Sequence, residues 1–395
     1  MMREVMTVTI PLSAPDITEA EIAAVTEVLR TPRLSLGPEL AAFERALADY
    51  HEVDHAVAVS SGTAGLHLAL LVLGVGKGDE VVIPSFAFVA VANAVLQVHA
   101  VPVFVEIDPV TLNMDPARVT QSITPRTRAM VVVHTFGVPA EMDALRTIAR
   151  QHGLALVEDA CEAVGARFGN PPAARRVGSF GDVGVLGFYP NKQLTTGEGG
   201  ALLCHDAGYA KRLRSLRNQG RSADGVSPAG EAEVGESLSG WLDHIEFGYN
   251  YRLSEIACAL GRVQLSRLDE MLALREAAAR RYDALFADVS GIERPLSEQP
   301  HRSISWFVYA VRLPTWVNRE HVQNVLAARG IATGRYFPPI HLQPTWRKHS
   351  SADVRLPITE TIACRMLALP FFNRITTSQQ QEVAEALSEA ISDKG

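Results

Sequence analysis

The sequence is poor in cysteine and has no long apolar run. Its four cysteines, Cys161, Cys204, Cys258 and Cys364, are scattered and form no Cys-x-x-Cys pair. This spacing favours neither a zinc site nor a disulfide framework, so we expect four free thiols and no bound metal. No stretch reaches the roughly 18 uninterrupted apolar residues of a membrane span. Residues 1–10 also lack the apolar core and small-residue cleavage site of a secretory signal. We therefore expect a cytoplasmic protein with no membrane partner.

The chain also has no excess of basic residues. It carries 37 Lys and Arg against 44 Asp and Glu, which gives a net charge of −7 and a pI near 6.0. Because a nucleic-acid-binding protein needs a basic face, we expect no nucleic-acid partner. With 47% hydrophobic and 21% charged residues the composition is that of an ordinary globular protein. Its 395 residues are enough for one large domain and one smaller domain.

Short apolar runs alternate with helical patterns as far as about residue 205. The expected strands are 55–59, 80–83, 102–107, 129–133 and 154–157, and the expected helices are 16–29, 38–50, 65–72, 90–97 and 143–152. This alternation predicts an α/β fold with a mostly parallel central sheet covered by helices on both faces.

A long helix with a bend near Leu268 is expected to follow, starting near Phe247 and ending near Phe286. Beyond residue 291 the pattern changes to a strand at 305–313 and helices at 318–329 and 378–391. We divide the chain into a large domain of residues 1–270, which includes the N-terminal helices, and a smaller C-terminal α+β domain of residues 271–395.

The stretch 181–203 centres on one lysine, Lys192, which lies between a Pro-Asn turn and a run rich in threonine and glycine. Most loop lysines are simply solvated. However, Asp159 closes the apolar run 154–157, and open α/β sheets bind ligands at such strand ends. The two residues are 192 − 159 = 33 positions apart, which leaves room for a helix and a strand. A lysine for the aldehyde and a carboxylate for the ring nitrogen are the two protein contacts that pyridoxal phosphate needs.

Several other stretches have both a functional and a structural interpretation. Residues 60–64 (SSGTA) stand between a strand and a helix, where backbone N–H groups hold phosphate, although Ser and Thr are also ordinary N-caps. Phe86 and Phe88 follow a strand and either stack on a flat cofactor or belong to the core. The basic stretch 212–221 is either a solvated helix end or a contact for an anionic substrate. Residues 222–242 read as a mobile loop or lid.

Four stretches together resemble one family. They are SSGTAGLHLAL (60–70), VEDACEAVGA (157–166), GFYPNKQLTTGEGG (187–200) and GYNYRLSEI (248–256). The chain is identified on these as a member of the DegT-type pyridoxal-phosphate-dependent sugar aminotransferases, with a likeness from about residue 8 to about 390. This resemblance implies the type I, aspartate-aminotransferase-like fold and a homodimer whose active sites are shared between subunits.

The resemblance also assigns roles to residues. It implies that Lys192 is the Schiff-base lysine and general base, Asp159 the partner of the pyridinium nitrogen, and Glu162 a neighbour of the ring hydroxyl. The other cofactor contacts it implies are Gly62, Thr63 and Ala64 at the phosphate, Phe88 on the ring, and Asn250 at the phosphate of the other subunit's cofactor. The substrate contacts expected from it are Tyr189, Arg252, Tyr336 and His341.

Two positions depart from the family pattern. Many members have a serine five residues before the lysine, where it contacts the phosphate, and this chain has Gly187 there. The residue before the stacking aromatic is often threonine, and here it is Ala87. The side-chain contact of residue 187 with the phosphate is therefore in doubt.

The implied activity is a ping-pong transfer of an amino group from L-glutamate to a nucleotide-linked keto-sugar, most often a 4-keto-6-deoxyhexose, in amino-sugar biosynthesis such as that of lipopolysaccharide O-antigens. A keto-cyclitol aminotransferase of antibiotic assembly and a non-catalytic sugar-sensing protein are the alternatives. A dehydratase branch of the family has histidine at the lysine position, and Lys192 argues against it. Loops 222–246 and 335–345 are expected to decide which sugar, nucleotide and carbon atom are used.

Overall fold

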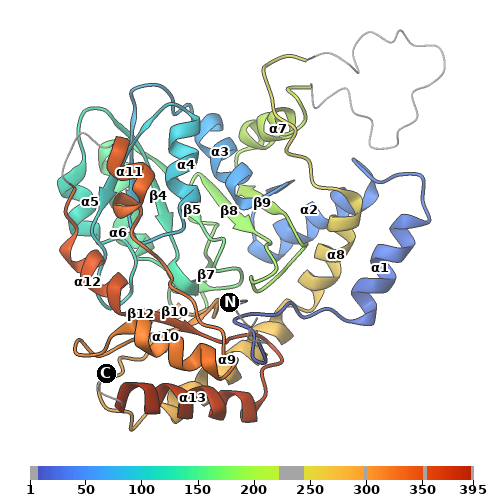
Figure 1. The fold of residues 1–395 in the computed structure, drawn as a ribbon. Helices are drawn as coiled ribbons and strands as arrows, with labels where there is room; N and C mark the ends of the chain where they lie inside the picture. Colours follow the sequence, from blue (N-terminus) through green and yellow to red (C-terminus); the bar gives the residue numbers. More distant parts are fainter. Residues whose placement is uncertain (1–7, 222–243, 298–299, 350–353, 393–395) are drawn as a thin grey trace, which may run out of the picture.

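A computed structural model describes residues 8–221, 244–297, 300–349 and 354–392 of the chain. Its centre is a seven-stranded sheet (Figure 1). In order across the sheet, the strands are β1 (His55–Val59), β9 (Gly200–Cys204), β8 (Val183–Gly187), β5 (Ala155–Asp159), β4 (Thr127–Val133), β2 (Glu80–Pro84) and β3 (Val101–Val105). Strand β9 runs antiparallel to both neighbours, and every other adjacent pair is parallel. The prediction of a mostly parallel sheet is confirmed.

Alternate side chains of these strands enter two apolar layers, as the two-residue period of a strand requires. On one face Ala58, Val132 and Leu186 pack against α2 (Pro38–His51), α5 (Pro116–Ser122) and α6 (Met142–His152). On the other face Val57 and Val133 pack against α3 (Gly62–Val72), α4 (Ala90–Gln97) and α7 (Ala207–Leu216). The sheet is therefore buried on both sides, which places its ligand-binding edge at the strand ends.

Two N-terminal helices pack on the start of the long helical stretch. Helices α1 (Glu19–Leu29) and α2 both contact α8 (Glu255–Ser266). Helix α1 begins with a capping box. The side chain of Thr18 accepts the backbone N–H of Glu21, and the side chain of Glu21 accepts the backbone N–H of Thr18. Helix α8 stops before Arg267, and α9 (Leu268–Leu285) follows at once. This break is the bend that the sequence predicts near Leu268.

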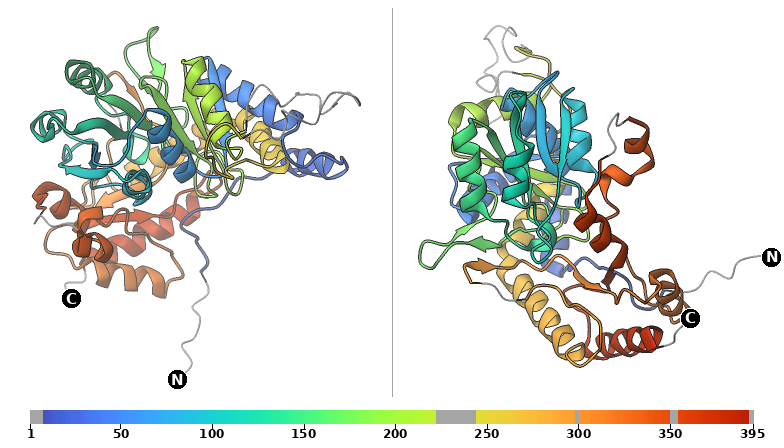
Figure 2. Two further views of the ribbon diagram at one scale, coloured as in Figure 1. Left: turned by 90° about the horizontal axis from the view of Figure 1, so that it is seen from above. Right: turned by 90° about the vertical axis from the view of Figure 1, so that its left-hand side faces the viewer.

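The C-terminal part has an apolar core of its own. The elements around this core lie below the sheet in Figure 1 and form a separate layer in the right view of Figure 2. These elements are α9, the antiparallel pair β11 (Tyr309–Arg312) and β12 (Met366–Leu369), α10 (Arg319–Ala328) and α13 (Thr377–Ser392). Between α10 and β12 in the sequence come η3 (Ile340–Leu342), α11 (Pro344–His349) and α12 (Pro357–Arg365), and Ile340 and Trp346 pack into the apolar layer of α3 and α4. Strands β6 (Arg167–Phe168), β7 (Arg175–Arg176) and β10 (Arg302–Ser303) form a small separate sheet, and η1 (Thr135–Gly137) follows β4.

Two features of this part differ from the sequence expectation. Strand β11 covers only the second half of the predicted strand 305–313, because the N–H of Ser305 donates to the carbonyl oxygen of Gly137 at 3.0 Å instead of joining the ladder. Ile10, assigned by prediction to the large domain, belongs to the C-terminal core and accepts the N–H of Ala332 at 3.0 Å. The domain boundary at residue 270 stays a prediction.

The described part of the chain offers no metal site and no membrane helix. No group of three or more His, Cys, Asp and Glu side chains lies within it in an arrangement that holds a metal ion. None of its helices combines the length and the apolar character that a membrane crossing requires. The predicted lid at residues 222–242 lies wholly outside the described residues, which resume at His244.

Candidate active site

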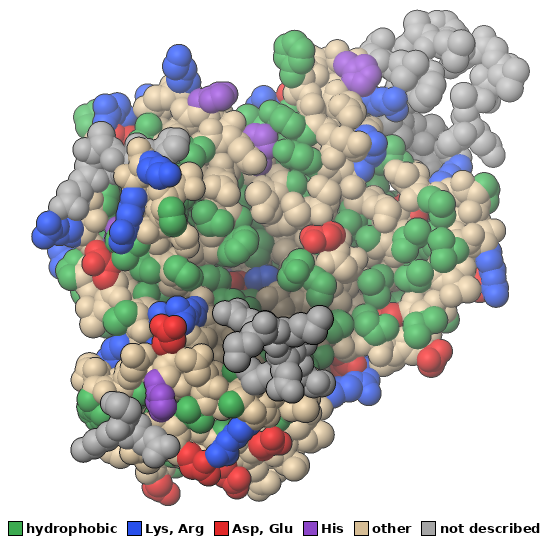
Figure 3. Space-filling model, viewed as in Figure 1, with side chains coloured by type: hydrophobic (Ala, Val, Ile, Leu, Met, Phe, Trp, Pro, Cys, Tyr) green, Lys and Arg blue, Asp and Glu red, His purple; other side chains and the backbone are tan. Residues whose placement is uncertain are grey.

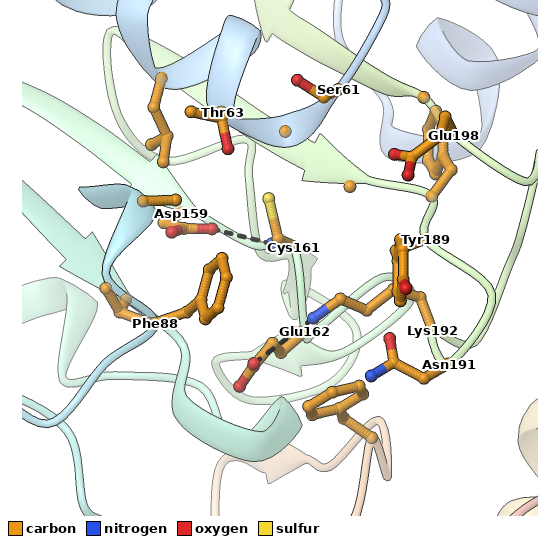
Figure 4. Close-up of a pocket in the computed structure, with 18 of the residues that line it drawn as sticks. Ser61, Thr63, Phe88, Asp159, Cys161, Glu162, Tyr189, Asn191, Lys192 and Glu198 are labelled. Atoms are coloured by element: carbon orange, nitrogen blue, oxygen red, sulfur yellow. Dashed lines mark hydrogen bonds and ion pairs between the residues drawn. The ribbon is translucent and has the colours of Figure 1, made fainter. Parts of the chain in front are cut away.

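A cavity of about 480 Å³ opens at the carboxyl ends of β4, β5 and β8, at Val133, Asp159 and Gly187. The predicted site residues Gly62, Thr63, Phe88, Asp159, Glu162, Tyr189, Lys192 and Tyr336 all line it, together with Ser61, Leu66, Ala90, Cys161, Phe188, Asn191, Glu198, Gly199, Phe307 and Phe337. Figure 4 shows Asp159 and Phe88 on one side of this space and Lys192, Tyr189 and Glu198 on the other, with Glu162 beside the lysine amine. The strand ends of an open α/β sheet thus carry the site, as expected of this architecture.

Lys192 reaches the cavity from the loop between β8 and β9. Its Nζ atom lies 3.4 Å from Oε1 of Glu162 and 3.9 Å from the centre of the Phe307 ring. The N–H of Lys192 donates to the carbonyl oxygen of Tyr189 at 2.9 Å, which closes the turn that bears the side chain. The side chain is 14% exposed, so the amine sits in a largely dry wall.

Glu162 is a buried carboxylate with fixed orientation. Its Oε2 accepts the N–H of Phe136 at 3.1 Å, while Oε1 faces Lys192. Phe136 has φ of 56°, a left-handed conformation that is costly for a bulky residue and that its surroundings hold in place. Burial raises the pKa of Glu162, and the charge of Lys192 and the N–H of Phe136 act in the opposite direction.

Asp159 ends β5 and faces the same cavity. Its Oδ1 accepts the N–H of Cys161 at 3.1 Å, the contact drawn as a dashed line in Figure 4. The ring of Phe88 lies between Asp159 and Glu162 in the same view and is 62% exposed. A flat ligand ring that packs on Phe88 would have a carboxylate at its edge and the lysine amine within reach.

The first turn of α3 forms one wall of the cavity. Gly62 and Thr63 line the cavity, and Ser61 caps the helix by accepting the N–H of Ala64 at 3.1 Å. A β-carbon at Gly62 would stand 2.8 Å from the sulfur of Cys161, so only glycine lets the helix start this close to β5. Free N–H groups at a helix N-terminus are suited to phosphate. Together with an amine and a carboxylate, this wall fits pyridoxal phosphate.

Four of the predicted residues do not line this cavity: Ala64, Asn250, Arg252 and His341. Arg252 donates to Oδ1 of Asn218 at 3.0 Å, and the exposed Asn250 pairs with Asn218 through a backbone bridge. His341 is buried, with Nδ1 2.7 Å from Oγ of Ser85 and Nε2 3.1 Å from Oε1 of Glu360. Its ring is engaged on both sides, so within this chain His341 holds the 335–345 loop against the end of β2 and does not line the cavity.

The arginines of the basic stretch 212–221 mainly make contacts with other residues of the chain. Arg217 pairs with Glu44 and also donates to the carbonyl oxygen of Ala58 at 2.6 Å. Arg212 donates to Glu246 at 3.1 Å. These contacts tie α7 to α2 and β1, and neither arginine lines the cavity.

Sequence reasoning missed three residues that shape the site. Phe307 packs on the lysine amine from the C-terminal part of the chain. Gln193 donates from Nε2 to the carbonyl oxygens of Glu162 at 2.6 Å and Ser305 at 2.8 Å. Arg275 on α9 donates to the carbonyl oxygens of Trp306 and Phe307. Only Gln193 had a local signal, its place next to the lysine; the other two act through contacts made across the fold.

Comparison with known proteins agrees with this geometry. The sequence model of the DegT/DnrJ/EryC1/StrS aminotransferase family matches residues 15–388. The erythromycin biosynthesis sensory transduction protein EryC1 of Saccharopolyspora erythraea is 40% identical over 89% of this chain and 90% of its own. The dTDP-3-amino-3,4,6-trideoxy-alpha-D-glucose transaminase of Streptomyces venezuelae is 39% identical over 93% and 91%. The GDP-perosamine synthase of Caulobacter vibrioides is 36% identical over 97% and 98%.

Solved structures give the same result. The PLP form of the putative sugar aminotransferase Spr1654 from Streptococcus pneumoniae superposes with a TM-score of 0.89 at 26% identity, covering 98% of this chain and 99% of that one. This likeness confirms the expected fold class, and it extends over the sheet, the lysine loop and the C-terminal part alike.

Proposed function

The chain belongs to the DegT/DnrJ/EryC1/StrS aminotransferase family, and we propose that it moves an amino group from L-glutamate to a nucleotide-linked keto-sugar, in particular a 4-keto-6-deoxyhexose. It is a pyridoxal-phosphate-dependent transaminase of the sugar aminotransferase type. The observation that carries the proposal is that Lys192 and Asp159 line the same cavity.

The cavity walls indicate which residues would hold the cofactor. The N–H groups at the start of α3, with Gly62 and Thr63, would bind its phosphate. The exposed face of Phe88 would support the ring, and Asp159 would stand at its nitrogen. When bound, pyridoxal phosphate supplies an aldehyde for the lysine and a ring that takes up electrons from the α-carbon of the amino donor.

The protein's own groups would handle the protons. The Asp159 carboxylate, fixed by the Cys161 N–H, would favour a proton on the ring nitrogen by its negative charge. The neutral amine of Lys192 would move the proton at the substrate α-carbon as general base. The aromatic side chains of Phe307 and Tyr336 on the lysine side, and of Phe337 beside Phe88, would limit the access of water.

The sugar half of the proposal rests on the relatives. Their names include a dTDP-linked amino sugar in one case and GDP-perosamine in another, so the proposal extends to nucleotide-linked keto-sugars as a class. A keto-cyclitol substrate is the second candidate, and it differs in having no nucleotide. Tyr189 and Tyr336 line the cavity mouth and stay the candidates for contacts with either substrate.

We also propose a homodimer in which Asn250 reaches the cofactor phosphate of the other subunit. Asn250 is exposed and lies outside its own chain's cavity, which suits a contact made in trans. Ile22 and Leu29, seven positions apart on α1, are exposed apolar side chains, and Figure 3 shows apolar side chains gathered over α1 and α8 on this face. Such a face is suited to an interface. Mixing Lys192→Ala chains with Asn250→Ala chains should restore activity, because a hybrid dimer has one site with both wild-type residues.

A spectroscopic experiment tests the activity. Purified protein with pyridoxal phosphate should show a visible band from the cofactor linked to Lys192, excess L-glutamate should remove it, and Lys192→Ala should show no such band. dTDP- and GDP-linked 4-keto-6-deoxyhexoses and a keto-cyclitol are then offered to the aminated enzyme, and the products are identified by mass spectrometry. Return of the visible band with the cyclitol alone would replace the sugar assignment. A protein that never shows the band would contradict the cofactor assignment.

A further inference from the structure

The carboxylate of Glu162 is held in one orientation, with one oxygen for the backbone and one for the lysine. Oε2 accepts the N–H of Phe136, and Oε1 lies 3.4 Å from Nζ of Lys192. The Glu162 carbonyl oxygen is itself bound by Gln193, the residue that follows the lysine. Both side chains are poorly hydrated, at 8% exposure for Glu162 and 14% for Lys192. A proton that leaves the Lys192 amine therefore has the Glu162 carboxylate beside it as an acceptor.

Other titratable groups face the same space. Asp159 and Glu198 bring carboxylates to the cavity, and Tyr189, Tyr336 and Cys161 bring weaker acids. Burial raises the pKa of the Cys161 thiol and of Tyr336, so both stay protonated at neutral pH. Within the described residues, Glu162 is the one carboxylate recorded within hydrogen-bonding distance of the lysine amine.

Neighbouring groups balance the two protonation states of the pair. The Phe307 ring, 3.9 Å from Nζ, favours the ammonium. The N–H of Phe136 favours the carboxylate. Burial opposes both charges, and it raises the pKa of Glu162. Oε1 of Glu162 is thus the acceptor beside the Lys192 amine, and burial makes the protonated form of this carboxyl easier to reach than it is in water.

We propose that Glu162 is the proton partner of Lys192: it takes a proton from the ammonium when the amine must be neutral and returns it afterwards. The step converts an ammonium and a carboxylate into an amine and a carboxylic acid, and it needs no other reactant. A neutral amine is the form that attacks the cofactor aldehyde and that acts as a base on the substrate. This inference rests on the proposed function, and it assigns Glu162 a task beyond contact with the cofactor ring.

The test is the rate at which apoenzyme captures pyridoxal phosphate, followed by stopped-flow absorbance of the visible band between pH 6 and 9. In wild type the pair shares one proton, so the fraction of neutral amine, and with it the capture rate, should be nearly independent of pH. In Glu162→Gln the amine must lose its proton to solvent. Its capture should be at least about tenfold slower at pH 7 and should rise about tenfold per pH unit.

The direction in which Glu162→Gln changes the capture rate distinguishes this proposal from a simple ion pair. If Glu162 only anchors the ammonium, Glu162→Gln frees the amine and captures the cofactor faster than wild type, which overturns the proposal. Glu162→Asp keeps an acceptor at longer reach, so it should be slow but flat with pH, and it gives the answer if the glutamine variant fails to fold. A steep Glu162→Asp profile would likewise overturn it.

Glu198→Gln is the matched control. It removes the same charge from the cavity wall but not the partner of the lysine, so its profile should stay flat. A steep profile in this control would show that cavity charge, and not the acceptor at Oε1, sets the pH dependence. Absence of capture by wild type would count against the proposed function and not against the role of Glu162 within it.

Discussion

The guanidinium of Arg275 donates to the main-chain carbonyl oxygen of Lys192 at 3.4 Å. The same side chain donates to the carbonyl oxygens of Trp306 at 3.3 Å and Phe307 at 3.2 Å. It is only 2% exposed, and burial lowers its pKa to about 10. One buried cation on α9 therefore joins the loop of Lys192 to the segment whose Phe307 packs on the lysine amine.

Replacing Arg275 by methionine should loosen both segments at once. The change leaves buried carbonyl oxygens without donors, at about 1–3 kcal/mol for each acceptor that finds no new partner. We expect the free energy of unfolding in urea to fall by about 2 kcal/mol or more and cofactor capture to slow. Arg275→Lys keeps the charge but lacks the forked donors, so it should recover only part of the loss. Wild-type stability in the methionine variant would show that these carbonyls do not depend on Arg275.

The side chain of Cys161 fills the space that a side chain at position 187 would need. A β-carbon at Gly187 would lie 3.1 Å from Cβ and from Sγ of Cys161. Gly187→Ser, which adds a potential phosphate contact, should therefore weaken cofactor binding or folding by about 1–3 kcal/mol through overpacking. Cys161→Ala in the same chain removes the sulfur contact and should recover part of that loss. Dissociation constants for pyridoxal phosphate, together with thermal midpoints, separate the two effects. A serine variant that binds more tightly than wild type would contradict the steric argument.

The chemistry-bearing core of the site could be predicted because it follows from local pattern. Asp159 ends an apolar strand and Lys192 lies on a loop between two others, and parallel strands bring such ends to one edge of a sheet. A helix after the small polar turn 60–64 was also predicted from local pattern, although α3 begins at Gly62, three residues before the predicted start at Gly65. In each case the signal lies within a few residues of the functional side chain.

Contacts made across the fold had no such signal. Phe307 and Arg275 act only because α9 and the segment after it return to the lysine loop. His341 shows the reverse error: its loop was placed correctly near the site, but its ring is buried between Ser85 and Glu360. Asn250 depends on a second chain, and its role stays a prediction. The joining of Ile10 to the C-terminal core depends equally on a partner more than 300 residues away.

Glu21 makes the stability of the N-terminal helices depend on pH. Burial alone would raise its pKa, but hydrogen bonds from Thr18, Arg267 and Gln264 lower it from 4.5 to about 2. A lowered pKa contributes stability that is complete above pH 4.5 and is lost as the pH falls toward 2. Over a shift of this size the contribution is about 3 kcal/mol. Glu21→Gln should therefore unfold more easily at pH 7, with a difference from wild type that shrinks toward pH 3.

The control for Glu21 lies on the same helix. Glu27 forms an exposed ion pair with Arg30, and such pairs add little to stability. Glu27→Gln should match wild type in urea unfolding at every pH. If Glu21→Gln differs from wild type by a constant amount from pH 7 to pH 3, its effect comes from lost packing and not from its charge.

Asp159→Asn should separate catalysis from folding. The asparagine Oδ1 can still accept the Cys161 N–H, so the end of β5 keeps its hydrogen bond and thermal stability should change little. What disappears is the negative charge that favours a proton on the ring nitrogen. We expect the cofactor to link to Lys192 and show its visible band, while the glutamate half-reaction slows by about 10²-fold or more, as when one preorganised charge contact is lost. A cofactor analogue methylated on the ring nitrogen carries that positive charge permanently and should return part of the rate to Asp159→Asn. A variant with full activity would contradict the assigned role of Asp159, and a slow variant that the analogue does not rescue would show that the carboxylate acts on another atom.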